Sequence, residues 1–186
     1  MNVWNRSFLA FWIASGVMLA FVPGRAPVAA SATKIDIEVD AALEHFRHEV
    51  PGGGSFLRRA KGVLVFPKVI KAGVGIGGEY GEGALRIGGR TVAYYSTAGA
   101  SIGFQLGAQA KTVVLVFLDS RALQDFRDSK GWKAGVDGSV AIAKWGVGED
   151  INSVDFKDPI VGFIFGNKGL MYNLTIEGSK FTRIEP

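Results

Sequence analysis

The 186-residue sequence contains no cysteine and only two histidines, and these absences remove several classes of function. Without cysteine the chain has no disulfide framework, no thiol nucleophile and no cysteine to carry a lipid anchor. His45 and His48 lie one helical turn apart, flanked by Glu44 and Glu49. We interpret them as a solvated helix face rather than as metal ligands or members of a catalytic triad. Since no carboxylate pair has a spacing typical of acid–base catalysis, the sequence predicts no enzyme, no metal and no cofactor.

The N-terminus carries an uncharged apolar run of sixteen residues, Ser7–Val22, preceded by Arg6. Ala30-Ser31-Ala32 then has the small-x-small form of a signal-peptidase site. Sixteen residues fall short of the ~20 that a membrane-spanning helix needs. We therefore expect residues 1–32 to be a signal peptide cut between Ala32 and Thr33, with an uncleaved anchor as the alternative. The mature chain, residues 33–186, is expected to be a single domain, periplasmic or secreted.

The net positive charge of the mature chain is small, but the charges are unevenly distributed. Removal of the signal peptide, which holds two arginines and no acid, lowers the formal net charge from +4 to +2. So weak a charge gives no support to nucleic-acid binding. Residues 33–49 carry −3, residues 79–186 are neutral, and residues 50–78 carry +5 with no acid. The cations of this last segment are Arg58, Arg59, Lys61, Lys68 and Lys71.

Helical periodicity appears in two places. An amphipathic helix is predicted over residues 33–49, with one apolar face made by Ile35, Val39, Ala42, Leu43 and Phe46. It should end at Pro51-Gly52-Gly53-Gly54, after which Ser55 is expected to cap a short turn through Phe56–Lys61. Asp119 is predicted to cap an internal helix that places Leu123 and Phe126 on one face.

The rest of the chain is predicted to be strands, because glycine is too dense between residues 60 and 109 for helix. Glycine turns are expected at Gly81-Glu82-Gly83 and Gly88-Gly89, and a hairpin at 166–169. The expected strands are Gly62–Phe66, Gly73–Tyr80, Ala84–Ile87, Thr91–Tyr95, Ser101–Ala108, Thr112–Leu118, Val136–Trp145, Ile160–Phe165 and Leu170–Ile176. The predicted fold class is α+β: β-dominated antiparallel sheet or sheets with glycine-rich turns, an N-terminal amphipathic helix and one internal helix.

Two glycine motifs are better explained by sheet structure than by ligands. Gly73–Gly78 satisfies G-x-G-x-x-G, but the following Glu79-Tyr80-Gly81 does not open a helix, and no acid occurs between Glu82 and Asp119. A dinucleotide site needs both features. Gly99, Gly103 and Gly107 recur every four residues, which keeps them on one face of a strand and favours close sheet packing over a membrane helix.

The five cations remain as the candidate binding site. Clustered Lys and Arg attract acidic lipids at ~1 kcal/mol per charge, and Arg offers a fork that matches phosphate. Apolar residues interleave with them and are expected to insert at an interface: Phe56, Leu57, Val69 and Ile70. A solvated surface is the alternative.

Several ordered motifs resemble the SYLF-domain family over about residues 38–184. They are Arg59–Phe66 with the Gly73–Gly78 run, Thr97–Ala108, Val113–Leu118, Ala122–Phe126, Lys168–Leu170 and Glu177-Gly178. The resemblance implies non-catalytic binding of phosphoinositides and other acidic lipids, and actin binding in fungal members. It also implies that basic residues, here Arg58, Arg59 and Lys61 with Lys68 and Lys71 as companions, meet the membrane together with an N-terminal helix. For an exported bacterial member, the anionic lipids at hand would be phosphatidylglycerol or cardiolipin.

A second hypothesis comes from another functional class. The glycine-rich sheet could pack against copies of itself, which would make the protein a self-associating scaffold of the cell envelope and a homo-oligomer.

Overall fold

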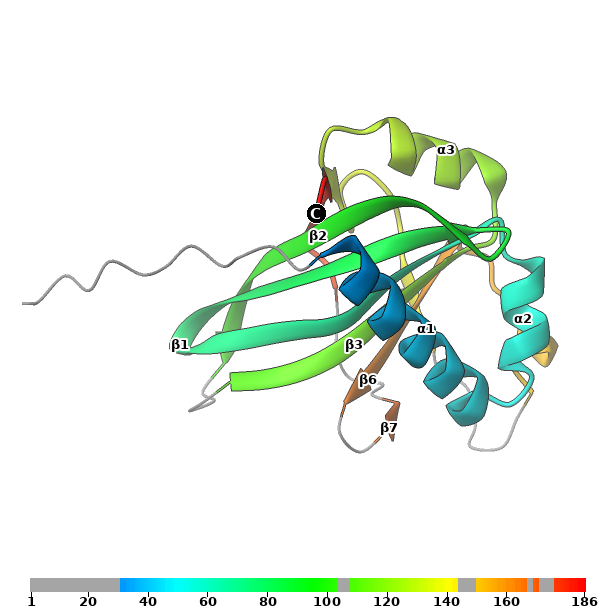
Figure 1. Cartoon of the computed structure of the whole chain (residues 1–186), viewed down its shortest axis with the longest axis horizontal. Coiled ribbons are helices and arrows are strands. Elements are labelled where there is room, and N and C mark those ends of the chain that lie inside the picture. Colours follow the sequence, from blue (N-terminus) through cyan, green and yellow to red (C-terminus); the bar gives the residue numbers. More distant parts are fainter. Residues whose placement is uncertain (1–30, 104–107, 144–149, 167–168, 171–175) are drawn as a thin grey trace, which may run out of the picture.

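The computed structural model describes residues 31–103, 108–143, 150–166, 169–170 and 176–186 (Figure 1). In chain order its elements are α1 (Ala32–Glu49), α2 (Gly53–Arg59), β1 (Gly62–Ile87), β2 (Arg90–Gly103), β3 (Ala108–Phe117), α3 (Ser120–Asp128), β4 (Trp132–Lys133), β5 (Ala141–Ile142), the 3-10 helix η1 (Ile151–Ser153), β6 (Ile160–Gly166), β7 (Gly169–Leu170) and β8 (Lys180–Ile184). One sheet runs β4-β8-β2-β1-β3-β6-β5, and β7 pairs with β6. The predicted α+β class is confirmed, although the sheet is mixed because β5 runs parallel to β6.

The strand β1 doubles back on itself at the centre of the sheet. Its residues 62–72 pair with β3, whereas residues 75–87 pair with β2. A Cβ added at Gly83 would lie 2.0 Å from the carbonyl oxygen of Val65, eighteen residues earlier in the same strand. Only a reversal of the chain brings these positions together, and Figure 1 shows the ribbon turning back near the β1 label. We call the two parts the first arm (62–72) and the second arm (75–87).

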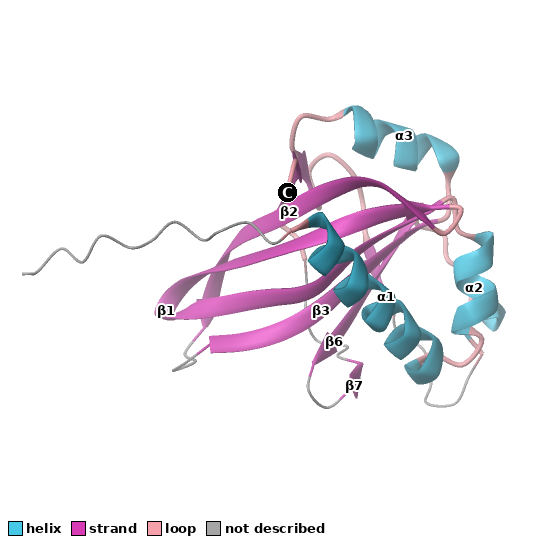
Figure 2. Ribbon diagram, viewed as in Figure 1, coloured by secondary structure: helices cyan, strands magenta, loops and turns pink. Residues whose placement is uncertain are grey.

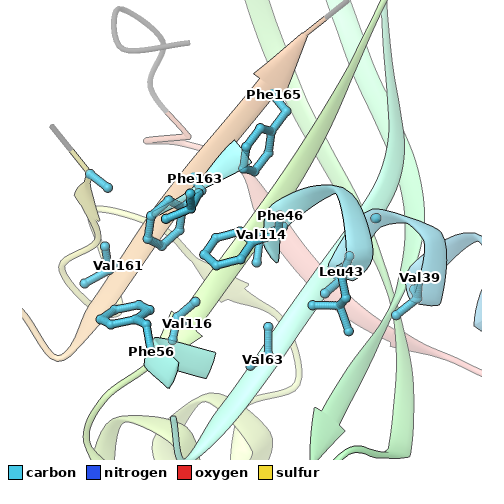
Figure 3. Packing of buried hydrophobic residues seen from close by; sticks show 14 of the residues in the cluster. Val39, Leu43, Phe46, Phe56, Val63, Val114, Val116, Val161, Phe163 and Phe165 are labelled. Atoms are coloured by element: carbon cyan, nitrogen blue, oxygen red, sulfur yellow. The ribbon is translucent and has the colours of Figure 1, made fainter. Parts of the chain in front are cut away.

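Alternation along the strands gives the sheet two apolar faces. Helices α1 and α2 cover one face and α3 lies on the other (Figure 2). On the α1 face Phe46 packs edge-on against Phe163, with ring centroids 4.8 Å apart (Figure 3). On the α3 face Phe126 stands among Tyr95, Phe117 and Trp132. Each strand of the centre is therefore buried on both sides, which explains the continuous apolar runs of β3 and β6.

Most helix predictions are confirmed. The five residues named for the apolar face of the first helix are all buried. The Asp119 side chain accepts a hydrogen bond from the Ala122 backbone N–H at 2.9 Å, which caps α3. Ser55 does not cap a turn. It lies inside α2 and donates its hydroxyl to the Gly52 carbonyl at 2.8 Å, while Gly52 itself occupies the cap position with φ of 75°.

The strand predictions are correct in place but wrong in several boundaries. The turn expected at Gly81-Glu82-Gly83 is wrong, because these residues lie within the second arm and the glycines admit the backbone of the first arm. The turn at Gly88-Gly89 is confirmed by positive φ at both residues. The hairpin at 166–169 is confirmed by pairing of Gly166 with Gly169, although residues 167–168 lie outside the described part.

Further boundaries differ in the same way. The strands expected at 62–66, 73–80 and 84–87 are one strand, and residues 91–95 extend to Gly103. Of the predicted strand 101–108, residues 101–103 belong to β2 and Ala108 to β3, and residues 104–107 lie outside the described part. Of Val136–Trp145 only Ala141–Ile142 forms a strand, with 144–145 outside the described part. Of Leu170–Ile176 only Leu170 lies in a strand, and residues 171–175 are likewise not described.

Candidate functional site

Three of the five predicted cations lie where α2 leads into β1. Arg58 and Arg59 form the last turn of α2, a position where the helix dipole favours positive charge. Lys61 follows, and its backbone N–H donates to the Phe117 carbonyl at 2.8 Å, which fixes the entry into β1. All three side chains belong to exposed residues. We call Arg58, Arg59 and Lys61 the α2 basic cluster.

The α2 basic cluster has little internal neutralisation. No ion pair within 4 Å joins it to an acid among the described residues. Asp150 lies near Arg59, and its pKa is below its usual value chiefly because the Asn152 backbone and side chain donate hydrogen bonds to it, and also because of the charge of Arg59. The three cations are therefore available to an anion outside the protein.

Lys68 and Lys71 are not brought together with the α2 basic cluster. They lie seven and ten residues beyond Lys61 along the extended first arm, which at ~3.3 Å per residue places them roughly 20 Å or more away. A register shift between Phe66 and Val69 marks a bulge in this arm. Since side chains alternate along a strand, Lys68 and Lys71 lie on opposite faces of the sheet. The positive segment of the sequence is thus one cluster and two separate lysines.

The apolar residues expected to insert at an interface are mostly in the core. Phe56 and Val69 are 1% and 0% exposed, and Leu57 packs against the α1-face cluster. The expectation for these three residues is wrong, because each points toward the sheet interior rather than along the cationic surface. Ile70 is the exception, with 42% of its surface exposed.

The apolar face of α1 is likewise committed to the core. On its polar side Asp36 accepts hydrogen bonds from Thr91 at 2.6 Å and Tyr94 at 3.0 Å. Arg86 bonds the Asp40 carboxylate at 2.8 Å and the Asp36 backbone carbonyl at 3.3 Å. Burial and the bond to Asp36 raise the pKa of Tyr94. Because α1 is fastened to the sheet on both sides, its apolar face does not lie free for insertion into a membrane.

An open groove of about 400 Å³ runs between α1 and the sheet. Pro67 stands at the bulge, where its carbonyl accepts the Thr112 hydroxyl at 2.8 Å. His45 contacts the ring of Phe165 edge-on, with centroids 5.4 Å apart. We call this the α1 groove, and its lining residues are Glu38, Ala41, Ala42, His45, Pro67, Lys68, Ala110, Lys111, Thr112, Phe165 and Gly166. Four elements from distant parts of the sequence form it, so local patterns gave no sign of it.

A nearly buried ion pair lies on the α3 face of the sheet. The Lys111 ammonium is 2.8 Å from the Glu79 carboxylate, and the two side chains are 12% and 10% exposed. The Ser179 hydroxyl donates to the other oxygen of Glu79 at 3.1 Å. Gly99, opposite Glu79 in the register, leaves room for that carboxylate. No local pattern predicts this network, although Lys111, a charged residue directly before the apolar run 112–118, is a usable signal.

Residues 98–185 match the model of the Ysc84 family, described as Las17-binding protein actin regulator. The resemblance to the SYLF family is confirmed. The SYLF match covers the end of β2 together with β3, α3 and all later elements. It associates the chain with a family of lipid- and actin-related binding domains rather than with an enzyme family. No curated protein matches the chain.

The described residues contain no group of three or more histidine, aspartate or glutamate side chains arranged to hold a metal ion. None of the helices in the described ranges has the length and hydropathy required to span a bilayer.

Proposed function

We propose that this SYLF protein binds anionic phospholipids at a membrane surface, without catalytic turnover. The observation that supports it is the α2 basic cluster, whose three exposed cations have no ion-pair partner in the described part of the chain. Guanidinium groups bind phosphate with two parallel hydrogen bonds and lysine adds a point charge. Lys68 and Lys71 lie farther along β1, so each would contact lipid separately from this cluster.

Vesicle sedimentation tests the proposal. The protein should bind phosphatidylcholine vesicles that contain phosphatidylglycerol or cardiolipin, less to pure phosphatidylcholine, and more weakly as salt rises. Replacing Arg58, Arg59 and Lys61 by alanine should lower the affinity roughly a hundredfold, at ~1 kcal/mol per charge. The matched control replaces Arg121, Arg127 and Lys130, three exposed cations in and after α3. Equal loss in both triple variants, or binding insensitive to salt, would contradict the assignment.

We propose further that the protein is exported. The supporting observation is the apolar run Ser7–Val22 followed by Ala30-Ser31-Ala32. Cleavage after Ala32 would remove Ser31, which caps α1 through a 3.4 Å hydrogen bond from the Lys34 backbone N–H. Mass spectrometry of the protein recovered from the periplasm or medium should give Thr33 as the first residue. An intact N-terminus on protein found with membranes would indicate the uncleaved anchor.

Self-association is the second candidate function. On the α1 face beyond the helix, Ile70 and Tyr80 are exposed among small neighbours, with Ala110 opposite Ile70 and Ala98 opposite Tyr80. So flat a patch of small side chains would allow two sheets to approach closely. Light scattering over a dilution series distinguishes the candidates, since a monodisperse monomer at high concentration excludes a scaffold.

A further inference from the structure

We propose that the α1 groove takes up one acyl chain of an anionic phospholipid while Lys68 at its rim holds the phosphate. This inference rests on the proposed lipid-binding function and adds a second, structurally separate contact with the lipid. The groove's volume of about 400 Å³ lies within the ~300–1,000 Å³ range of small-molecule clefts.

The walls of the groove are small and apolar. Ala41 and Ala42 on α1 face Ala110 on β3, and Phe165 with Gly166 supplies the β6 side. Small residues on a helix and on the strand opposite it leave the space that larger side chains would fill. A groove of this shape suits a flexible hydrocarbon chain better than a planar or polar ligand.

Little free charge faces the groove, because the side chain of Lys111 lies on the opposite, α3 face of the sheet and Glu38 has a cationic partner. The ammonium of Lys111 is held by Glu79 at 2.8 Å, and Glu38 lies 3.8 Å from Lys34. The remaining cation, Lys68, is exposed and has no ion-pair or hydrogen-bond partner in the ranges the structure describes. An apolar groove with a single unpaired cation at its rim is complementary to an amphiphile with one negative charge.

The groove continues onto an exposed apolar surface. Ile70, two residues after Lys68, lies on the same face of the first arm and pairs with Ala110, which lines the groove. Ala72 and Tyr80 extend this surface away from α1 and are also exposed. A lipid could therefore move from a bilayer resting on this surface into the groove without crossing a polar barrier among these residues. Because the apolar face of α1 is buried, the lipid chain enters the protein rather than the helix entering the lipid.

The test uses monomeric short-chain lipids, so that binding in the groove is measured without a membrane surface. The full protein is titrated with dioctanoyl phosphatidylglycerol below its micelle concentration, with glycerol phosphate as the headgroup alone, and with dioctanoyl phosphatidylcholine. Saturable binding of the first is expected, with weaker binding of the last and none of the headgroup alone. Each buried methylene should change the affinity about fourfold.

Two pairs of variants locate the site. Ala110→Trp fills the groove and should lower the affinity more than tenfold if it displaces two or more methylenes. Val136→Trp places the same side chain at an exposed position after β4 and should leave binding unchanged. Lys68→Ala should weaken phosphatidylglycerol binding about fivefold and phosphatidylcholine binding little, whereas Lys130→Ala should affect neither. Circular dichroism and thermal unfolding confirm that each variant is folded.

Each contrary outcome identifies what fails. Equal effects of Ala110→Trp and Val136→Trp, or equal affinity for the headgroup alone and the dioctanoyl lipid, overturn the groove assignment. Dimerisation that depends on Ala110 without lipid binding also overturns it and indicates a second copy as the occupant. If vesicles bind through the α2 basic cluster but the single lipid does not bind, this inference fails and the proposed function stands. If wild-type protein binds neither vesicles nor the single lipid, both fail.

Discussion

The carboxylate of Glu79 and the ammonium of Lys111 lie 2.8 Å apart although the first arm of β1 separates their strands. The pair therefore ties the second arm of β1 to β3 across an intervening strand. Ser179, just before β8, joins the same carboxylate. Three parts of the sheet thus meet at one nearly buried charge.

Removal of Lys111 should destabilise the protein strongly. Lys111→Met leaves the Glu79 carboxylate without its counter-ion at 10% exposure, and we expect the free energy of unfolding to fall by about 3 kcal/mol. The double variant Glu79→Leu with Lys111→Met should recover most of this loss because no uncompensated charge remains. Urea unfolding measures both, with Lys71→Met as the control, a lysine on the neighbouring first arm of β1. A Lys111→Met protein as stable as the control would contradict the importance of the pair.

Two glycines of β1 should respond differently to alanine. At Gly83 the added Cβ would meet the Val65 carbonyl oxygen at 2.0 Å, so Gly83→Ala must push the two arms apart and should cost at least ~3 kcal/mol or prevent folding. At Gly78 the nearest atom, the Gly99 carbonyl oxygen, lies 3.8 Å away, so Gly78→Ala should be nearly neutral. Soluble yield and thermal unfolding compare the two variants, and similar behaviour would rule out close approach as the reason for Gly83.

The two acids of α1 that contact Arg86 should differ in importance. Asp36→Ala leaves the hydroxyls of Thr91 and Tyr94 without their acceptor and should lower stability by about 2 kcal/mol. Asp40 is 67% exposed and bonds only Arg86 among the described residues, so Asp40→Ala should cost less than ~1 kcal/mol. Chemical unfolding of both variants provides the comparison. If Asp40→Ala proved the more damaging change, the attachment of α1 to the sheet would depend on Arg86 rather than on the hydroxyls of Thr91 and Tyr94.

Tyr80 should titrate far above ordinary tyrosines. Partial desolvation of the phenol, the 2.8 Å hydrogen bond to Glu82 and the negative charge of Glu82 raise its pKa from 10.0 to about 12. Between these values the unfolded chain has lost the phenolic proton and the folded chain retains it, so this contribution to stability is complete below pH 10 and disappears as pH rises toward about 12. The phenolate absorbance of wild type minus Tyr80→Phe measures the pKa. Glu82→Gln should shift it part of the way back, since burial remains; no change would exclude the carboxylate as a cause.

Features set by short-range chemistry could be predicted from the sequence. The spacing of Val39, Leu43 and Phe46 depends only on helix geometry, and α1 has that face buried. The continuous apolar run after Lys111 predicted a central strand, and β3 is paired on both sides. Asp119 was recognisable as a cap because its bond reaches only three residues ahead.

Features that depend on distant segments could not be predicted. Gly81 and Gly83 resembled a turn, since nothing in the local sequence shows that Val65 and Lys68 would lie against them. Adjacent cations appeared to form one patch, but an extended strand carries Lys68 away from Lys61 and a bulge sets its face. Ala41 and Phe165 both line the α1 groove although they are more than a hundred residues apart in the sequence. No local sequence pattern predicts that they lie close together in space.

The central position of β1 limits how such a domain can be transferred between genes by recombination. The family match begins at residue 98, within β2, yet both arms of β1 stand between β2 and β3. A gene fragment that encoded only residues 98–185 would leave β3 with an unpaired edge and would uncover the apolar face that α1 and α2 protect, which favours aggregation over folding. Any recombination that transfers this domain intact must therefore include the codons from Gly62 onward, well before the segment by which the family is recognised.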